Sequence, residues 1–289
     1  MLVEYKKLKY GYTAEGWEQA YQNEYKDLQN LRLKLLIEDE AISEVLQDIY
    51  KIMLDFRLQG KPINVLDIGC GVGHQLCAIS HLCDNSLGFD ISEEVVKNNN
   101  TLNCAARFLT GDALNHPDLG QKSNIVLMAG VLYAIDENRE THRRILSEAY
   151  NSLSEDGFFI FYHRAYLNVL TYLDKKLANL RNRDKDGMDY YMCWFDDAYI
   201  LSLLDEIGFK VVSVHKADFA YPLNSTVFRK LFVKSKYWDY DSYRSYNHYN
   251  KEYNSYKRLN FLGKFMYILS RHVFNTLSAR TSIFILQKR

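Results

Sequence analysis

The spacing of apolar positions changes near residue 62 and separates an N-terminal helical part from the rest of the chain. Between Ile42 and Phe56 the apolar residues recur every three or four positions, which predicts one face of an amphipathic helix. Gly60 and Pro62 end this pattern. The next residues, 63–68, form a short apolar run followed by glycines, which is typical of a buried parallel strand.

Predicted strands and helices then alternate along the chain. Further strands are predicted at residues 86–91, 106–110, 125–129, 158–162, 209–214 and 282–286, and helices at 73–82, 93–100, 139–153, 164–195 and 195–204. Alternating units of this kind give a parallel sheet with helices on both faces. The predicted fold is α/β: a seven-stranded, mostly parallel, doubly wound sheet whose last strand is antiparallel, with N-terminal helices and a helical cap inserted before the last strand.

The last two predicted strands are separated by more than sixty residues, which exceeds an ordinary loop and implies an inserted helical element. We divide the chain into an N-terminal helical segment or lid (1–60), a Rossmann-like core (61–217 with 281–289) and a Tyr-rich cap (218–280). Because strand 209–214 runs parallel to its neighbours, its exit lies at the carboxyl edge of the sheet, where ligands bind. We expect the cap to overhang that edge.

Charge is distributed unevenly between these parts. The whole chain balances 36 basic against 36 acidic side chains, but residues 223–289 hold thirteen Lys or Arg and only three Asp or Glu. The cap and last strand are therefore basic and the main body acidic, so the two attract each other or different partners. Packing of one against the other is the simplest interpretation.

Several classes of protein are not indicated. No stretch of eighteen uncharged apolar residues occurs, and the first residues, MLVEYKKLKYGY, contain no apolar core, so we expect neither a spanning helix nor a signal peptide, and a cytoplasmic location. Five cysteines without a CxxC pair favour reduced thiols over a disulfide framework or a zinc site. No metal is predicted.

Three glycines, at positions 69, 71 and 73, stand where the first predicted strand turns into a helix. A backbone without Cβ atoms approaches a ligand closely, and the helix N-terminus that follows favours a negative group. The nicotinamide fingerprint GxGxxG requires glycine at the next position of the pattern, where this chain has His74.

The GxGxG run after Asp67 instead resembles the first motif of class I, Rossmann-like S-adenosylmethionine-dependent methyltransferases, and three later motifs resemble that family in order across residues 63–217. The resemblance implies S-adenosylmethionine as cofactor and S-adenosylhomocysteine as product. It implies that Asp67 orients the amino group, Asp90 accepts from the ribose hydroxyls and Asp112 accepts from the adenine amino group. The implied cofactor-binding residues are Asp67, Gly69, Gly71, Gly73, Asp90, Ile91, Asp112, Ala113, Met128 and Ala129.

Residues just after the fourth and fifth core strands should face the acceptor, because the crevice of an open α/β sheet lies there. These are Tyr133, Asp136, His163 and Arg164. We expect His163 to emerge at the rim, either as a general base or as a residue that shapes the pocket. Tyr133 is the second catalytic candidate, although many relatives have histidine or glutamate there. Methyl transfer is an in-line displacement that needs positioning more than acid or base help.

Aromatic residues cluster at both ends of the chain. Near the N-terminus, Tyr12, Trp17 and Tyr21 either line a lid over the cofactor, as N-terminal helices of the family do, or pack within their own helix. Between 237 and 256 tyrosines recur every three or four residues, and 261–278 is an amphipathic basic segment. This tail could bind a phosphate-bearing acceptor, lie on a membrane surface or simply pack on its own domain.

The leading functional hypothesis is methyl transfer from S-adenosylmethionine to a small polar acceptor, neutral or anionic: a sugar, nucleotide-linked sugar or lipid-linked glycan precursor. RNA methylation, for example of tRNA, is a second hypothesis, against which stand the neutral net charge and the lack of a recognisable RNA-binding module. A non-catalytic S-adenosylmethionine-binding protein is a third. Nucleic acid is therefore not the expected partner.

Overall fold

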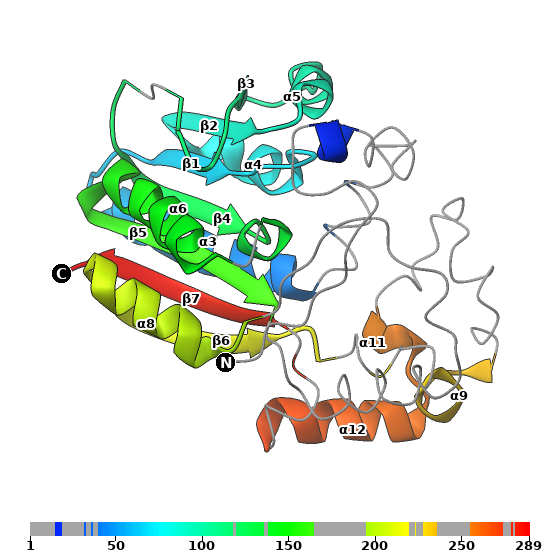
Figure 1. Ribbon diagram of the computed structural model, residues 1–289. Helices are drawn as coiled ribbons and strands as arrows, with labels where there is room; N and C mark the ends of the chain where they lie inside the picture. Colours follow the sequence, from blue (N-terminus) through cyan, green and yellow to red (C-terminus); the bar gives the residue numbers. More distant parts are fainter. Residues whose placement is uncertain are drawn as a thin grey trace.

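The computed structural model describes residues 15–18, 32, 36, 40–117, 120–135, 138–164, 195–219, 223, 228–235, 255–273, 279 and 281–289. One seven-stranded sheet with helices on both faces forms its centre (Figure 1). Its strands are β1 (Asn64–Ile68), β2 (Asn85–Asp90), β3 (Arg107–Thr110), β4 (Ser123–Ala129), β5 (Leu153–Arg164), β6 (Phe209–Ala217) and β7 (Thr281–Lys288). The helices are α3 (Glu40–Leu58), α4 (His74–Ile79), η1 (Ser80–Leu82), α5 (Glu93–Asn99), η2 (Leu132–Ala134), α6 (Arg139–Ser152), α8 (Asp197–Ile207), α9 (Arg229–Phe232), α11 (Ser255–Arg258) and α12 (Phe261–His272).

The sheet order is β3-β2-β1-β4-β5-β7-β6. Neighbours from β3 to β5 are parallel, whereas β7 lies antiparallel between β5 and β6. The predicted mostly parallel sheet with an antiparallel last strand is confirmed. Thr281 pairs with both Arg164 and Ala217, so the chain leaves β6 and re-enters β7 at the carboxyl edge of the parallel strands.

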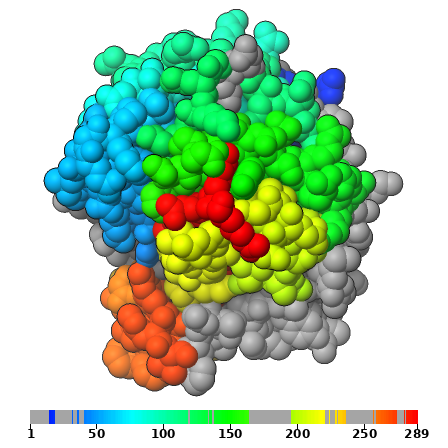
Figure 2. Space-filling view, turned by 90° about the vertical axis from the view of Figure 1, so that its left-hand side faces the viewer, coloured from blue at the N-terminus to red at the C-terminus, as the bar shows by residue number. Residues whose placement is uncertain are grey.

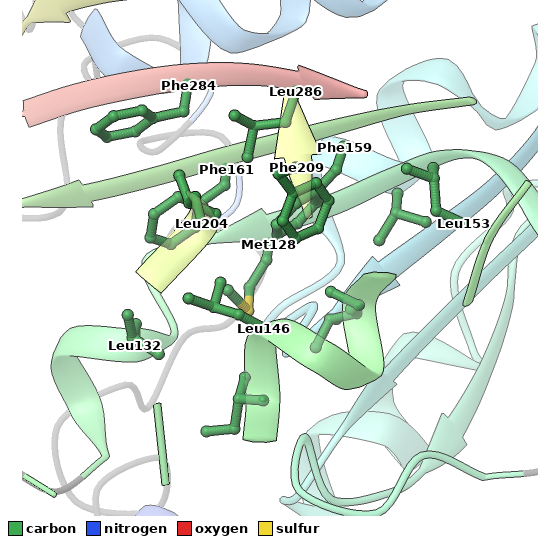
Figure 3. Close-up of a cluster of buried hydrophobic side chains, with 14 of the residues drawn as sticks. Met128, Leu132, Leu146, Leu153, Phe159, Phe161, Leu204, Phe209, Phe284 and Leu286 are labelled. Atoms are coloured by element: carbon green, nitrogen blue, oxygen red, sulfur yellow. The ribbon is translucent and has the colours of Figure 1, made fainter. Parts of the chain in front are cut away.

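Side chains alternate between two cores, one on each face of the sheet. On one face Phe159, Phe161 and Phe284 pack with residues of α6 and α8, as Figure 3 shows for part of this cluster. On the other face Ile160 and Ile283 pack with residues of α3, α4 and α5. Strands that are buried on both faces read as continuous apolar runs, which is why the sequence pattern located them.

Local chemistry explains where individual elements begin and end. Helix α8 starts at Asp197 because the Asp196 side chain accepts a hydrogen bond from the backbone nitrogen of Tyr199 at 2.7 Å, and it ends at Gly208, whose φ of 104° closes the last turn. The predicted strand 158–162 begins earlier, since Leu153 already pairs with Ser123. The predicted helix at 164–195 lies outside the described residues apart from its two ends.

Two features near the edges of the fold differ from the expectation or extend it. Cys77 and Cys104 are joined by a disulfide, with their Cα atoms 5.5 Å apart, so the expectation of reduced thiols is wrong for this pair. The fold brings together α4 and the segment after α5, a contact that the spacing of 27 residues does not reveal. Within the described part of 218–280, α9 and α12 share a small core of their own. No helix among the described residues is long and apolar enough to cross a membrane.

Candidate active site

The glycine-rich turn after β1 adopts a backbone that only glycine accommodates without strain. Gly69, Gly71 and Gly73 have φ angles of 65°, 50° and 70°. At Gly69 a Cβ atom would lie 2.4 Å from Cγ2 of Val131, which comes from the loop after β4. Glycine is therefore required there both by the left-handed conformation and by the approach of a second loop.

Side chains from distant segments hold this turn in place. Nδ2 of Asn99 donates to the Gly71 carbonyl oxygen at 2.7 Å, and Nε of Arg32 donates to the Val72 carbonyl oxygen at 2.5 Å. One guanidinium nitrogen of Arg32 also donates to side-chain oxygens of Asn98 and Asn99, both at 2.8 Å. Arg32 and Asn99 were not among the predicted site residues, because a polar side chain carries no sequence signal of the distant backbone that it contacts.

Asp90 ends β2 and faces the turn. Its side chain accepts a hydrogen bond from the Gly71 nitrogen at 2.8 Å and from the Ser92 nitrogen at 3.1 Å. Burial raises the pKa of Asp90, the two backbone donors lower it, and the charge of Glu18 raises it. The carboxylate thus joins the end of β2 to the glycine turn, and its role toward ribose hydroxyls remains a prediction.

Asp67, in β1, is a buried carboxyl group that lacks a full set of partners. Within the part of the chain that the structure describes, its Oδ1 atom is enclosed and accepts no hydrogen bond. Burial and then the nearby charge of Asp90 raise the pKa of Asp67 to about 8. An enclosed carboxylate beside a second one attracts a cation, and the amino group of S-adenosylmethionine has the charge that fits.

The remaining predicted cofactor residues lie along the same edge of the sheet. Oδ1 of Asp112 accepts from the Leu114 nitrogen at 2.9 Å, so this aspartate shapes the turn after β3. Met128 is completely buried in the core, whereas Ala129 at the end of β4 is partly exposed. Ile91 and Ala113 are also partly exposed. Their contacts with the cofactor remain predictions.

The N-terminal segment reaches this region through the short helical turn at residues 15–18. Oε1 of Glu18 accepts a hydrogen bond from the Glu94 nitrogen, at 3.1 Å, in the first turn of α5. Trp17 is partly buried in the same turn, while Tyr12 and Tyr21 lie outside the described residues. The turn therefore lies beside the loop that follows Asp90, where the sequence predicts a lid.

His163 does not emerge at the rim of the sheet as we expected. It is completely buried, and its ring lies beside those of Phe161 and Phe284, with centroids 5.8 and 5.6 Å away. The expectation was wrong because β5 extends to Arg164 and pairs with β7 as far as that residue, which keeps His163 inside the sheet.

A polar cluster forms around His163 at the carboxyl edge. Nε2 of His163 lies 3.3 Å from Oδ1 of Asp197, and Ser282 donates to the same oxygen at 2.7 Å. Lys216 forms an ion pair with Asp197 and donates to Oγ of Ser282 at 2.6 Å. Burial raises the pKa of Asp197, but its hydrogen bonds with His163, Lys216 and Ser282 outweigh burial and hold that pKa below its usual range. The four residues come from β5, α8, β6 and β7, so no local sequence motif predicts that they meet.

The other acceptor-side candidates are placed only in part. Tyr133 lies in η2, directly after β4 as predicted, whereas Arg164, which was predicted to follow the strand, is the last residue of β5. Their side chains and Asp136 lie outside the described part of the chain. Their roles therefore remain predictions.

Comparisons with known proteins agree with this geometry. Residues 66–161 match a family model described as a methyltransferase domain. Magnesium protoporphyrin IX methyltransferase from Synechocystis PCC 6803, solved with bound S-adenosylhomocysteine, has a similar fold: TM-score 0.50, 19% identity, covering 70% of this chain and 92% of that one. The PH0226 protein from Pyrococcus horikoshii OT3 matches with a TM-score of 0.50 and 13% identity over 94% of this chain and 99% of its own. No curated protein sequence matches the chain.

The sheet order, the glycine turn and the domain matched at residues 66–161 are similar to those of class I, Rossmann-like S-adenosylmethionine-dependent methyltransferases. The predicted resemblance to this family is confirmed for residues 66–161, and the predicted cofactor agrees with the S-adenosylhomocysteine bound in the similar Synechocystis structure. The matched residues run from Leu66 in β1 to Phe161 in β5 and include every residue that the sequence assigned to the cofactor.

Proposed function

We propose that this methyltransferase binds S-adenosylmethionine along β1, β2 and β4 and methylates a small polar acceptor, with a sugar, a nucleotide-linked sugar or a lipid-linked glycan precursor as the candidates. The observation that supports the cofactor site best is Asp67, whose Oδ1 is enclosed and without a hydrogen-bond donor among the described residues. A bound cofactor would supply the cation that this carboxylate lacks.

When bound, S-adenosylmethionine supplies a methyl group on a positively charged sulfur. The protein's task is then mainly to hold the cofactor and the acceptor in line. We assign the cofactor end to Asp67 for the amino group, Asp90 for the ribose and the turn at 69–73 for close backbone contact. The hydrogen bonds from Gly71 and Ser92 already orient the Asp90 carboxylate, so binding requires little rearrangement there.

The acceptor end is supported by the cluster of His163, Asp197, Lys216 and Ser282 at the same edge of the sheet. Asp197 contacts the other three residues and keeps their side chains in one arrangement. We propose that this cluster positions the polar acceptor through its hydrogen-bonding groups. Because the His163 ring is enclosed, a positioning role fits the structure better than a base that meets the acceptor directly.

A transfer assay with radiolabelled S-adenosylmethionine tests the proposal. We expect S-adenosylhomocysteine to bind and label to enter nucleotide sugars or polyprenyl-linked sugars, but not tRNA. Label in tRNA alone would replace the small acceptor by RNA. Cofactor binding with no transfer to any acceptor class would favour the non-catalytic binder.

A further inference from the structure

Helix α12 turns an apolar stripe away from the rest of the protein. Gly263 and Ser270 are buried on its inner face. On the opposite face, at successive helical turns, Phe261, Phe265 and Ile268 are 89%, 55% and 50% exposed. A surface helix of a globular protein ordinarily points its polar side outward. The arrangement in α12 is the reverse, because its own small core occupies the inner side.

The stripe continues onto neighbouring residues. Leu262 on α12 is 41% exposed and Leu231 on α9 is 54% exposed. Nδ2 of Asn260 donates to the Leu231 carbonyl oxygen at 2.8 Å, which holds α9 against the start of α12. We call Leu231, Phe261, Leu262, Phe265 and Ile268 the outer apolar face. In Figure 2 the α12 segment, in orange, lies at the lower edge of the molecular surface.

The two described stretches that carry this face are basic. The described stretches 228–235 and 255–273 contain seven Lys or Arg and no Asp or Glu. Lys230 and Lys234 are exposed beside Leu231. On α12 itself Lys264 and Arg271 follow one flank of the stripe, and Arg271 pairs with Glu44 of α3 at 2.7 Å. That ion pair fastens one flank of α12 to the body and leaves the apolar stripe outward.

We propose that the outer apolar face docks on an anionic membrane surface. Aromatic and aliphatic side chains are stabilised by burial in the headgroup region of a membrane, and Lys and Arg side chains are attracted to anionic lipids. A second copy of this chain is a poorer partner, because a symmetric contact would place each basic surface against its own equivalent. The phosphates of RNA would form ion pairs with the Lys and Arg side chains, but RNA would leave Phe261 and Ile268 without an apolar environment. The inference does not depend on the identity of the acceptor.

Vesicle sedimentation of the full chain tests the surface. We expect binding to vesicles of phosphatidylcholine mixed with phosphatidylglycerol. The triple variant Phe261→Ser, Phe265→Ser, Ile268→Ser should bind roughly a thousandfold more weakly, since burial of each of the three side chains contributes about a factor of ten. The matched control is Leu54→Ser with Leu58→Ser on α3, which removes side chains that are 59% and 77% exposed elsewhere. It should bind like the parent.

A second variant separates charge from apolar contact and does not rely on α12 remaining intact. Lys230→Gln with Lys234→Gln should weaken binding to the anionic vesicles by roughly fivefold per charge removed, with a smaller effect at high salt. S-adenosylhomocysteine affinity should stay unchanged in all these variants. Failure of the parent to bind anionic vesicles, or equal binding by the triple variant, overturns the proposal. The proposal is also overturned if light scattering shows that the parent forms a dimer, the triple variant does not, and the parent does not bind vesicles.

Discussion

The two halves of the sheet edge are built in different ways. At the end formed by β1 and β2, the site consists of a continuous turn whose backbone is shaped by glycines, and Asp90 contacts it through backbone nitrogen atoms. At the end formed by β5, β7 and β6, the site consists of side chains from four separate elements. Three of them, from the three strands, contact the fourth, Asp197 of α8. The first half depends on local backbone conformation, and the second depends on tertiary contacts.

This difference has a physical consequence for mutations. A change in the glycine turn alters backbone conformation and should affect folding and cofactor binding together. A change in the Asp197 cluster removes one of several converging side chains and should affect the acceptor half while the cofactor half stays intact.

Gly69→Ala should have the largest effect. A left-handed conformation costs an L-residue about 1–2 kcal/mol, and crowding against a packed neighbour adds about 1–3 kcal/mol. The added Cβ would lie 2.4 Å from Val131. We expect a corresponding loss in the free energy of unfolding and in S-adenosylhomocysteine affinity, measured by urea denaturation and calorimetry.

Gly60→Ala is the matched control for that substitution. Gly60 has a φ of 67°, but a Cβ there would meet no atom within 4 Å. Only the conformational cost of about 1–2 kcal/mol should appear, with cofactor affinity unchanged. Equal effects of the two substitutions would show that contact with the loop after β4 is unimportant.

His163→Ala should lower turnover by roughly a hundredfold while cofactor affinity stays the same, if His163 acts in the reaction. Asp197→Asn should lower turnover in the same direction, because Asp197 holds the ring. The pH profile of turnover distinguishes a base from a positioning residue: loss of a base removes the acidic limb, whereas loss of a positioning residue only lowers the curve. His215, whose Nε2 lies 3.1 Å from Oδ2 of Asp48, provides the control variant His215→Ala. An unaltered rate for His163→Ala would leave it with a packing role only.

Asp90→Ala should weaken S-adenosylhomocysteine binding by about 1.5–3 kcal/mol, the range of hydrogen bonds to a charged group. NAD should not compete. Asp156→Ala, at an exposed position, is the control. Calorimetry that gave equal affinity for Asp90→Ala and the parent would contradict the assignment of the ribose to this residue.

The pH dependence of stability tests the carboxyl group of Asp67. Because burial raises the folded-state pKa of Asp67 to about 8, above its unfolded value, the folded protein binds the extra proton between about pH 4 and pH 8. Its contribution to stability is therefore full below about pH 4 and is lost as pH rises toward 8. Asp67→Asn should flatten this part of the stability curve, measured by urea denaturation across pH.

Cofactor binding provides the complementary measurement on the same carboxyl group. If the amino group of S-adenosylhomocysteine pairs with ionised Asp67, binding near pH 7 should release a proton, and affinity should rise roughly fiftyfold from pH 6 to pH 8. Calorimetry in buffers of different ionisation enthalpy counts that proton. The same release in Asp67→Asn would point to another group.

Much of the fold was predictable because the relevant forces act over short stretches of chain. Strands buried on both faces require continuous apolar runs, and the turn after β1 requires glycine at Gly69. The apolar runs therefore located the strands, and the glycines located the turn. The excursion between β6 and β7 was predictable from its length, and its departure from the carboxyl edge followed from strand direction. The helix at 164–195 and the acceptor-side residues Tyr133 and Arg164 remain predictions.

Tertiary structure alone decided the features that depend on distant partners. The burial of His163 follows from the pairing of β5 with β7, more than a hundred residues later in the chain, and its neighbour Asp197 comes from α8. The Cys77–Cys104 disulfide and the contacts of Arg32 with the glycine turn likewise join segments that carry no mutual sequence signal. Apolar periodicity reports which face of an element is buried, but not which element covers it. By itself the sequence therefore determined the cofactor turn, while packing decided the composition of the acceptor side.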